Sequence, residues 1–274
     1  MITIDLHTHT SHSHGQATVQ EMFEAGCARG LLVHGFSEHS PRPSGYDYPK
    51  DYRDKLTRSF PDYVEQVRTL AATYAPERTV LLGLEMDWLP GQEPFIDATI
   101  HRYDYDYVIG GIHFLGTWGF DYTPDDWQGF SPEQTADIYV RYFESLRRMA
   151  ASGMFDIAAH PDIIKIFSAA AFHDWLATDK AKAVVRDALE TMHTAGMAME
   201  ISSAGLRKPC KEIYPCPDIM RMAADIGLPV TFGSDAHCVN TIGWGFDTLA
   251  DYARGFGYTR SVWMRRGERF ERPF

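Results

Sequence analysis

Two pairs of side chains, each with a spacing of two residues, are the features of this sequence most suited to chemistry. His7 and His9 stand near its beginning, and Asp235 and His237 stand near its end. On an extended strand, side chains two residues apart point to the same side, so both members of a pair can reach one metal ion. Buried imidazoles and carboxylates without a metal would need many partners or would repel one another on protonation. We therefore interpret these residues as metal ligands.

Further histidines and carboxylates follow other short apolar runs of the chain. They are Glu38, His39, Glu85, His113, His160 and Glu200. In a parallel α/β barrel the loops after the strands carry the chemistry, so these residues should converge on one mouth of the barrel. Imidazole-rich sites favour Zn, Fe or Mn over Mg or Ca. Because the candidate ligands outnumber those that one ion takes from a protein, the sequence predicts two or three divalent transition-metal ions and hydrolysis.

The elements that must position these residues alternate along the chain. Short β-rich apolar runs are separated by longer amphipathic stretches, which is typical of β-α units around a parallel sheet. The runs cover residues 2–6, 31–36, 79–86, 107–112, 155–159, 198–201 and 229–232, and an eighth, weaker run covers 261–264. We predict an α/β barrel that forms a single domain over residues 1–274.

Helix signals lie between the runs. Thr18 and Glu21 form a capping box at the start of a helix over 18–28. Ser131 and Pro132 begin a second helix, which ends before Gly153, and a third follows Lys180 and extends to residue 196. Residues 41–52, rich in proline and tyrosine, are predicted to form a long loop.

Composition restricts the class of protein and its partners. The 274 residues are 45% hydrophobic and 23% charged, which is typical of a compact globular chain and excludes disordered and fibrous classes. The net charge of −11 repels polyanions, so we predict no nucleic-acid partner. No apolar run is long enough to span a bilayer, and the four cysteines show no CxxC spacing, so we expect no membrane association and a reducing, cytoplasmic location.

The opening Asp5-Leu6-His7-Thr8-His9 resembles that of the polymerase and histidinol phosphatase (PHP) family of metal-dependent phosphoesterases. Further blocks resemble the histidinol-phosphatase branch of this family. They are His14-Gly15, Ser37-Glu38-His39-Ser40-Pro41, Gly83-Leu84-Glu85-Met86-Asp87, Gly110-Gly111-Ile112-His113-Phe114, Trp118-Gly119-Phe120-Asp121, Ala159-His160-Pro161-Asp162, Glu200-Ile201, Ala204-Gly205-Leu206-Arg207-Lys208-Pro209 and Gly233-Ser234-Asp235-Ala236-His237. The resemblance implies a distorted (β/α)7 TIM-like barrel with its metal site at the C-terminal ends of the strands.

The resemblance also implies a ligand set for three ions. The first would be held by His7, His9, Glu85 and Asp235, the second by Glu85, His113 and His160, and the third by His14, His39 and His237. Of these, Glu85, Asp235 and His237 are the candidate catalytic residues. His12 competes with His14 for the third ion, and the pair His14-Gly15 favours His14. We predict structural roles for the histidines away from the strand ends, His34, His101, His173 and His193.

A phosphomonoester also needs cationic side chains near its dianion. Arg207 and Lys208 are the first candidates, and Lys165 and Arg42 are further ones. The implied reaction is hydrolysis of L-histidinol phosphate, a small-molecule phosphate ester, by hydroxide that bridges metal ions. Asp121 and Asp162 are candidate partners for the ammonium group of this substrate.

Three other functions compete with this one. A PHP-type phosphoesterase could use the same metal site on another small phosphate ester or a nucleotide. A non-catalytic metal-binding module would retain the barrel, but no gap in the ligand set supports it. Amidohydrolases share the two-histidine motif, but no lysine suited to carbamylation stands at a strand end. The oligomeric state is left open by the sequence.

Overall fold

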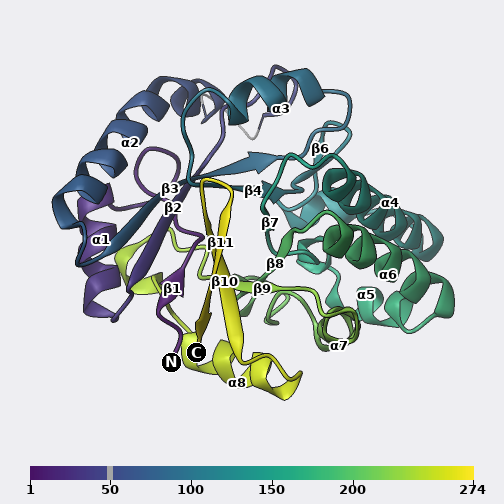
Figure 1. Cartoon of the computed structure of the whole chain (residues 1–274). Helices are drawn as coiled ribbons and strands as arrows, with labels where there is room; N and C mark the ends of the chain where they lie inside the picture. The colour runs from purple at the N-terminus through teal and green to yellow at the C-terminus, as the bar shows by residue number, and fades with distance from the viewer. Residues whose placement is uncertain (48–51) are drawn as a thin grey trace.

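The computed structural model describes residues 1–47 and 52–274 (Figure 1). Parallel strands form a nearly closed barrel in the order β1-β2-β3-β4-β7-β8-β9. These strands are β1 (Ile4–Asp5), β2 (Val33–His39), β3 (Thr79–Asp87), β4 (Tyr107–Gly111), β7 (Ile157–Ala158), β8 (Ala198–Ser202) and β9 (Val230–Gly233). Each overlaps a predicted run, and β2 extends three residues beyond its run to include Glu38 and His39, so the predicted distorted (β/α)7 TIM-like barrel is confirmed.

Backbone contacts between the first and last barrel strands bring the two edges of the sheet together. The amide of Leu6 donates to the carbonyl of Phe232 at 3.2 Å, and the amide of His9 donates to the carbonyl of Ala236 at 2.8 Å. Between neighbouring strands, the register pairs His39 with Glu85. All strand ends therefore meet at one rim, where the predicted site residues lie.

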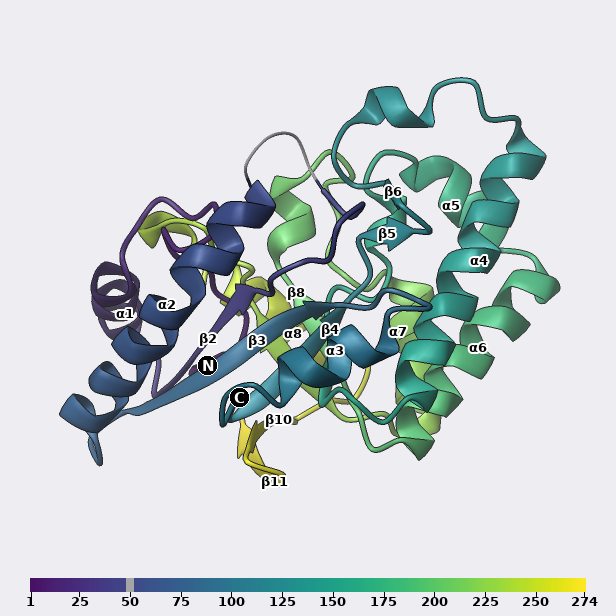
Figure 2. The same cartoon turned by 90° about the horizontal axis from the view of Figure 1, so that it is seen from above.

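Helices surround the barrel, and Figure 2 shows them from above. They are α1 (Val19–Ala28), α2 (Tyr52–Tyr74), α3 (Glu93–Ile100), α4 (Pro132–Ala151), α5 (Ala169–Leu176), α6 (Asp179–Thr194), α7 (Pro217–Ile226) and α8 (Phe246–Gly255). The capping box of Thr18 and Glu21 is present, and Ser131 caps α4 together with Gln134. Within the predicted loop 41–52, residues 41–47 form no helix or strand, residues 48–51 lie outside the described residues, and Tyr52 already belongs to α2.

Aliphatic side chains and one tyrosine fill the interior of the barrel. Tyr107 lies among Ile4, Leu6 and Ile109, and its hydroxyl donates to the carbonyl of Leu6 at 2.6 Å. Gly35 leaves the space for this ring, because a Cβ there would lie 2.2 Å from the tyrosine oxygen. A larger apolar core packs between the strands and the helices.

The predicted eighth run does not join the barrel. It forms β10 (Arg260–Arg265), which pairs antiparallel with β11 (Glu268–Pro273) in a separate hairpin that crosses the barrel in Figure 1. Val262 and Met264 of β10 pack into the interior cluster, and the amide of Arg266 donates to the carbonyl of Asp106, just before β4. The hairpin therefore closes the end of the barrel opposite the rim.

A second, smaller hairpin extends from the rim after β4. It consists of β5 (Phe114–Leu115) and β6 (Trp118–Gly119). In the described part of the chain, no helix combines the length and the apolarity needed to cross a membrane.

Candidate metal centre

The carboxylate of Glu85, near the end of β3, is the centre of a buried cluster of imidazoles. Its Oε2 lies 3.3 Å from Nε2 of His7, 3.4 Å from Nε2 of His9 and 2.8 Å from Nδ1 of His39. Its Oε1 lies 3.2 Å from Nε2 of His160 and 3.5 Å from Nε2 of His113. One carboxylate thus faces five ring nitrogens from four strand ends, as a ligand that bridges two cations would.

Ligand atoms in this cluster are close enough to share ions. Three groups have all their ligand atoms within 4.8 Å of one another: His7, His9 and Glu85; Glu85, His113 and His160; His9, His39 and His237. Asp235 joins the first group, because its Oδ1 lies 3.3 Å from Nε2 of His9 and 3.8 Å from Nε2 of His7. The structure brings together these predicted metal ligands.

Several polar atoms that face the centre of the cluster are buried without a hydrogen-bond partner among the described residues. They are Nε2 of His7, Nε2 of His9, Nε2 of His237 and Oε2 of Glu85. A buried polar atom without a partner is costly, whereas a divalent cation would bind all of these atoms as ligands. The donor set therefore fits metal ions, and its mixture of imidazole and carboxylate suits Zn, Fe or Mn.

Two carboxylates outside the ligand sets of the three predicted ions orient the imidazoles from behind. Glu200 on β8 places Oε1 2.7 Å from Nδ1 of His7, and Asp87 at the end of β3 places Oδ1 2.7 Å from Nδ1 of His113. Such bonds fix the tautomer and leave Nε2 free to bind a metal. The signal for Asp87 was its spacing of two residues from Glu85 on one strand, whereas only the fold reveals the partner of Glu200.

Backbone geometry at the rim is unusual at two predicted ligands. His160 has φ of 23° and Asp235 has φ of 48°, a region that residues other than glycine rarely adopt. Hydrogen bonds hold both turns, since the amide of His160 donates to Oε2 of Glu200 at 2.6 Å and Arg207 donates to the carbonyl of Asp235 at 3.2 Å. The surrounding fold therefore imposes the conformations that present these two side chains.

Charge and burial shift the ionisation of the cluster in opposite directions. Burial favours the neutral form of His237 and lowers its pKa to about 3, so its ring is neutral, as metal binding requires. Burial also disfavours charge on His113, but the hydrogen bond that its Nδ1–H donates to Asp87 and the charge of Glu85 outweigh it and raise the pKa of His113 to about 9. For Glu85, burial is outweighed by the neighbouring His39 and His7, which hold its pKa well below the usual range.

The structure separates the two histidines that compete for the third ion. Nδ1 of His14 lies 2.8 Å from the hydroxyl of Tyr52, and its ring centroid lies 4.1 Å from that of His237 and 5.0 Å from that of His39. The ring of His12 instead lies beside Tyr63. His14 is thus the one of the two that stands with His39 and His237.

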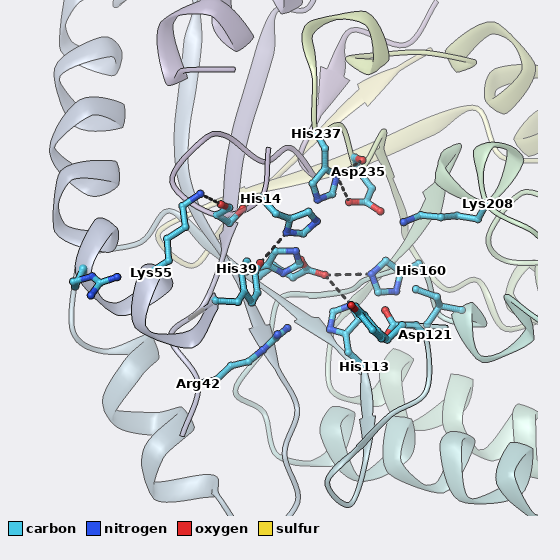
Figure 3. A pocket seen from close by; sticks show the side chains of 16 residues that line it. His14, His39, Arg42, Lys55, His113, Asp121, His160, Lys208, Asp235 and His237 are labelled. Atoms are coloured by element: carbon cyan, nitrogen blue, oxygen red, sulfur yellow. Dashed lines mark hydrogen bonds and ion pairs between the residues drawn. The ribbon is translucent and has the colours of Figure 1, made fainter. Parts of the chain in front are cut away.

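A cavity of about 690 Å³ opens over the cluster (Figure 3). Its wall is formed by Ser13, His14, His39, Arg42, Tyr52, Lys55, Arg58, Glu85, His113, Asp121, Tyr122, His160, Ile163, Lys208, Asp235 and His237. Arg42 and Lys208 are therefore the two predicted substrate-binding cations that line it. In Figure 3 the amino group of Lys208 is directed toward Asp235.

The other two predicted cations lie elsewhere. The side chain of Lys165 is fully buried, with Nζ 2.6 Å from Oδ2 of Asp162, 3.1 Å from the carbonyl of Ile213 and 3.4 Å from Oε2 of Glu212. Two hydrogen bonds and an ion pair thus hold this ammonium group away from the cavity, whose wall does not include Lys165. Asp162 pairs with Lys165, accepts the amide of Cys216 at 2.8 Å and does not line the cavity.

Arg207 lies behind the cavity wall, where it joins two rim loops. Its Nη2 donates to the carbonyl of Ser234 at 2.7 Å and to that of Asp235, and its guanidinium stacks over Trp244. Its Nη1 is buried without a hydrogen-bond partner among the described residues. Arg207 itself does not line the cavity.

The histidines assigned structural roles lie outside this cluster. His34 is buried and stacks on Phe36 at 4.3 Å between ring centroids, and burial lowers its pKa to about 3. His173 pairs with Glu212 at 2.8 Å. His101 is exposed beside Asp97.

A parallel barrel whose rim carries clustered imidazoles around a shared carboxylate defines the class of metal-dependent barrel hydrolases. A family model described as PHP domain matches residues 5–204. The chain belongs to this PHP family and, within it, to the histidinol-phosphatase branch. A protein of Deinococcus radiodurans described as a probable histidinol-phosphatase is 35% identical over 254 residues, which are 92% of this chain and 93% of that protein.

More distant relatives agree with this placement. The histidinol-phosphatase of Bacillus subtilis is 23% identical over 90% of this chain and 98% of its own length. The crystal structure of histidinol phosphate phosphatase from Lactococcus lactis, complexed with Zn, L-histidinol and phosphate, has a TM-score of 0.74 at 18% identity and covers 98% of both chains. At 18% identity, the likeness to the Lactococcus lactis structure shows a shared fold.

Proposed function

We propose that this protein is a metal-dependent phosphomonoesterase that hydrolyses L-histidinol phosphate to L-histidinol and phosphate. The observation that carries the proposal is the Glu85 carboxylate, which faces five imidazoles whose metal-facing atoms include buried nitrogens without partners among the described residues. Relatives described as histidinol-phosphatases that align over about nine-tenths of the chain support the choice of substrate. The Lactococcus lactis homologue, which was crystallised with Zn, L-histidinol and phosphate, supports both the metal and the ester.

The ions that this function requires would be Zn, Fe or Mn, two or three to a chain. One would be held by His7, His9, Glu85 and Asp235, a second by Glu85, His113 and His160, and a third by His14, His39 and His237. Close divalent cations lower the pKa of water toward neutrality and withdraw charge from phosphate oxygens. Glu85 makes this arrangement feasible, because its two oxygens face different groups of imidazoles.

Cationic side chains would hold and orient the phosphate dianion. Lys208 lines the cavity beside Asp235, and Arg207 supplies a buried Nη1 without a partner among the described residues. These groups can stabilise negative charge on the phosphoryl oxygens as a water oxygen bonds to phosphorus, the ester P–O bond breaks and the released alcohol oxygen takes up a proton. Asp121, on the cavity wall near His113, is a carboxylate suited to the ammonium group of the substrate.

The charge of the cavity explains how an acidic protein can take an anionic substrate. The net charge is −11, but Lys55, Arg58 and Lys208 line the wall, together with Arg42, whose charge is paired with Asp87. The cavity volume suits a small ester, and the overall charge opposes a nucleic-acid polymer. We propose further that residues 1–274 form a single PHP-type domain and that the protein acts in the cytoplasm, which its free cysteines support.

The direct test is phosphate release from L-histidinol phosphate by protein of known metal content. We expect release that stops on chelation and returns with Zn, Mn or Fe. Alanine at Asp235 or His9 should abolish turnover, whereas alanine at the exposed His101 should not. Bound metal with faster turnover of nucleoside monophosphates or bis-p-nitrophenyl phosphate would keep the site and replace the substrate. Protein that binds no metal would refute the site itself.

A further inference from the structure

Arg42 is a buried cation that lies within the cavity wall and also contacts a carboxylate behind it. Only 4% of the residue is exposed. Its Nε lies 2.5 Å from Oδ2 of Asp87 and its Nη2 lies 3.3 Å from Oδ1, so the guanidinium and the carboxylate form a two-point contact. A planar fork of this kind fixes the orientation of the carboxylate as well as its position.

Aromatic rings hold the guanidinium in this place. Its central carbon lies 5.1 Å from the ring centroid of Phe114 and 5.6 Å from that of Tyr52. Phe114 follows directly after His113 and belongs to the small hairpin on the rim. The segment after β2, which carries Arg42, is thereby fixed to the loop after β4, which carries His113.

The contact continues from Asp87 to a predicted metal ligand. Oδ1 of Asp87 lies 2.7 Å from Nδ1 of His113, and Nε2 of the same ring lies 3.5 Å from Oε1 of Glu85. Each carboxylate oxygen of Asp87 therefore has a defined partner, with Oδ2 on Arg42 and Oδ1 on both Arg42 and His113. Rotation of this carboxylate would break the bond that directs Nε2 of His113 toward the cluster.

We propose that Arg42 is a positioning residue, which locks Asp87 so that the His113 ring presents Nε2 to the ion that Glu85, His113 and His160 would hold. This differs from the phosphate contact predicted from the sequence, because Arg42 then acts through Asp87. The inference rests on the proposed metal-dependent function. It assigns Arg42 to one ion and predicts no effect on the ligands of the others.

Metal content tests this role separately from activity. The full chain and its variants Arg42→Met, Arg42→Lys and Lys208→Met would be dialysed against graded chelator, and Zn would then be titrated back with elemental analysis of the bound metal. We expect Arg42→Met to weaken one class of ion by about 10- to 100-fold, as for the loss of other groups that orient metal ligands. Arg42→Lys should recover only part of the affinity, because an ammonium cannot make the two-point contact. The matched control Lys208→Met, which removes another cavity cation, should retain all ions.

A second variant keeps the test decisive if Arg42→Met folds poorly. Asp87→Asn is nearly isosteric, and we expect it to weaken the same ion. The double variant, Arg42→Met with Asp87→Asn, should then lose no more metal affinity than the weaker-binding single variant, because both changes break the same chain of contacts.

Two results would overturn the inference. Full metal retention in Arg42→Met with a raised KM for the ester would show that Arg42 acts on phosphate. Additive losses in the double variant would show that Arg42 does not act through Asp87. Wild-type protein without bound metal would instead contradict the proposed function.

Discussion

Replacing Glu200 with glutamine changes one oxygen of a buried carboxylate and should weaken metal binding without disturbing the barrel. Oε1 of Glu200 lies 2.7 Å from Nδ1 of His7, and Oε2 accepts the amide of His160 at 2.6 Å. Glutamine offers one acceptor and one NH₂ group. The NH₂ group would face either the His160 amide, which is a donor, or Nδ1 of His7.

The size of the effect follows from the bond that is lost. If the NH₂ group faces His7, the ring must turn its N–H to Nε2, which then cannot bind a metal. If it faces His160, the backbone that holds φ of 23° loses its acceptor. A hydrogen bond to a charged group contributes about 1.5–3 kcal/mol, which corresponds to roughly 10- to 150-fold in metal affinity.

Competitive titration of Zn against a chelator, followed by phosphate release at saturating Zn, would measure this effect. Asp156→Asn is the matched control. The Asp156 carboxylate also accepts a backbone amide, that of Val108 at 2.8 Å, but it lies before β7, at the other end of the barrel. We expect the control to leave metal affinity unchanged. Unchanged affinity and activity in Glu200→Gln would refute the view that this carboxylate orients His7.

Three further changes test the site and the fold. Gly233→Ala should weaken metal binding as Glu200→Gln does, because a Cβ at Gly233 would lie 1.8 Å from Oε1 of Glu200; intact metal affinity would contradict this. Ser131→Ala should lower the free energy of unfolding by about 1 kcal/mol through loss of the α4 cap, measured by urea denaturation, with kcat unchanged. Lys165→Met should lower the free energy of unfolding by about 3–5 kcal/mol, again measured by urea denaturation, because it leaves Asp162 buried without its cation. Burial opposes the charge of Lys165, but Asp162 raises its pKa above the ordinary value. The pair should therefore stabilise the fold fully below the ordinary lysine pKa, and this stabilisation should disappear as pH rises through the folded pKa. If the free energy of unfolding had the same pH dependence in the variant and the wild type, this reasoning would be wrong.

Local sequence patterns were sufficient for the barrel strands and the helix ends. A strand buried on both faces needs a short apolar run, and a helix start needs a side chain that accepts a free amide, so both are encoded by neighbouring residues. Thr18 and Ser131 cap their helices as predicted. The candidate ligands were identifiable for a similar reason, because only certain residue types bind transition metals and the ends of parallel strands meet at one rim.

Long-range packing decided what local patterns could not. The weaker run 261–264 also forms a strand, but Arg266 and Gly267, with φ of 51° and 81°, turn the chain back into a hairpin that covers the interior cluster. Lys165 comes soon after the candidate ligand His160 in the sequence, so it was predicted to bind the substrate. In the structure its amino group instead pairs with the buried Asp162.

The sequence by itself determined the residue types, the order of the elements and the chemistry that they can support. Only the tertiary structure decided which side chains orient the ligands. Glu200 meets a histidine 193 positions away, and Arg42 meets a carboxylate 45 positions away. Such contacts leave no periodic pattern, because they depend on how separate β-α units are brought together around the barrel.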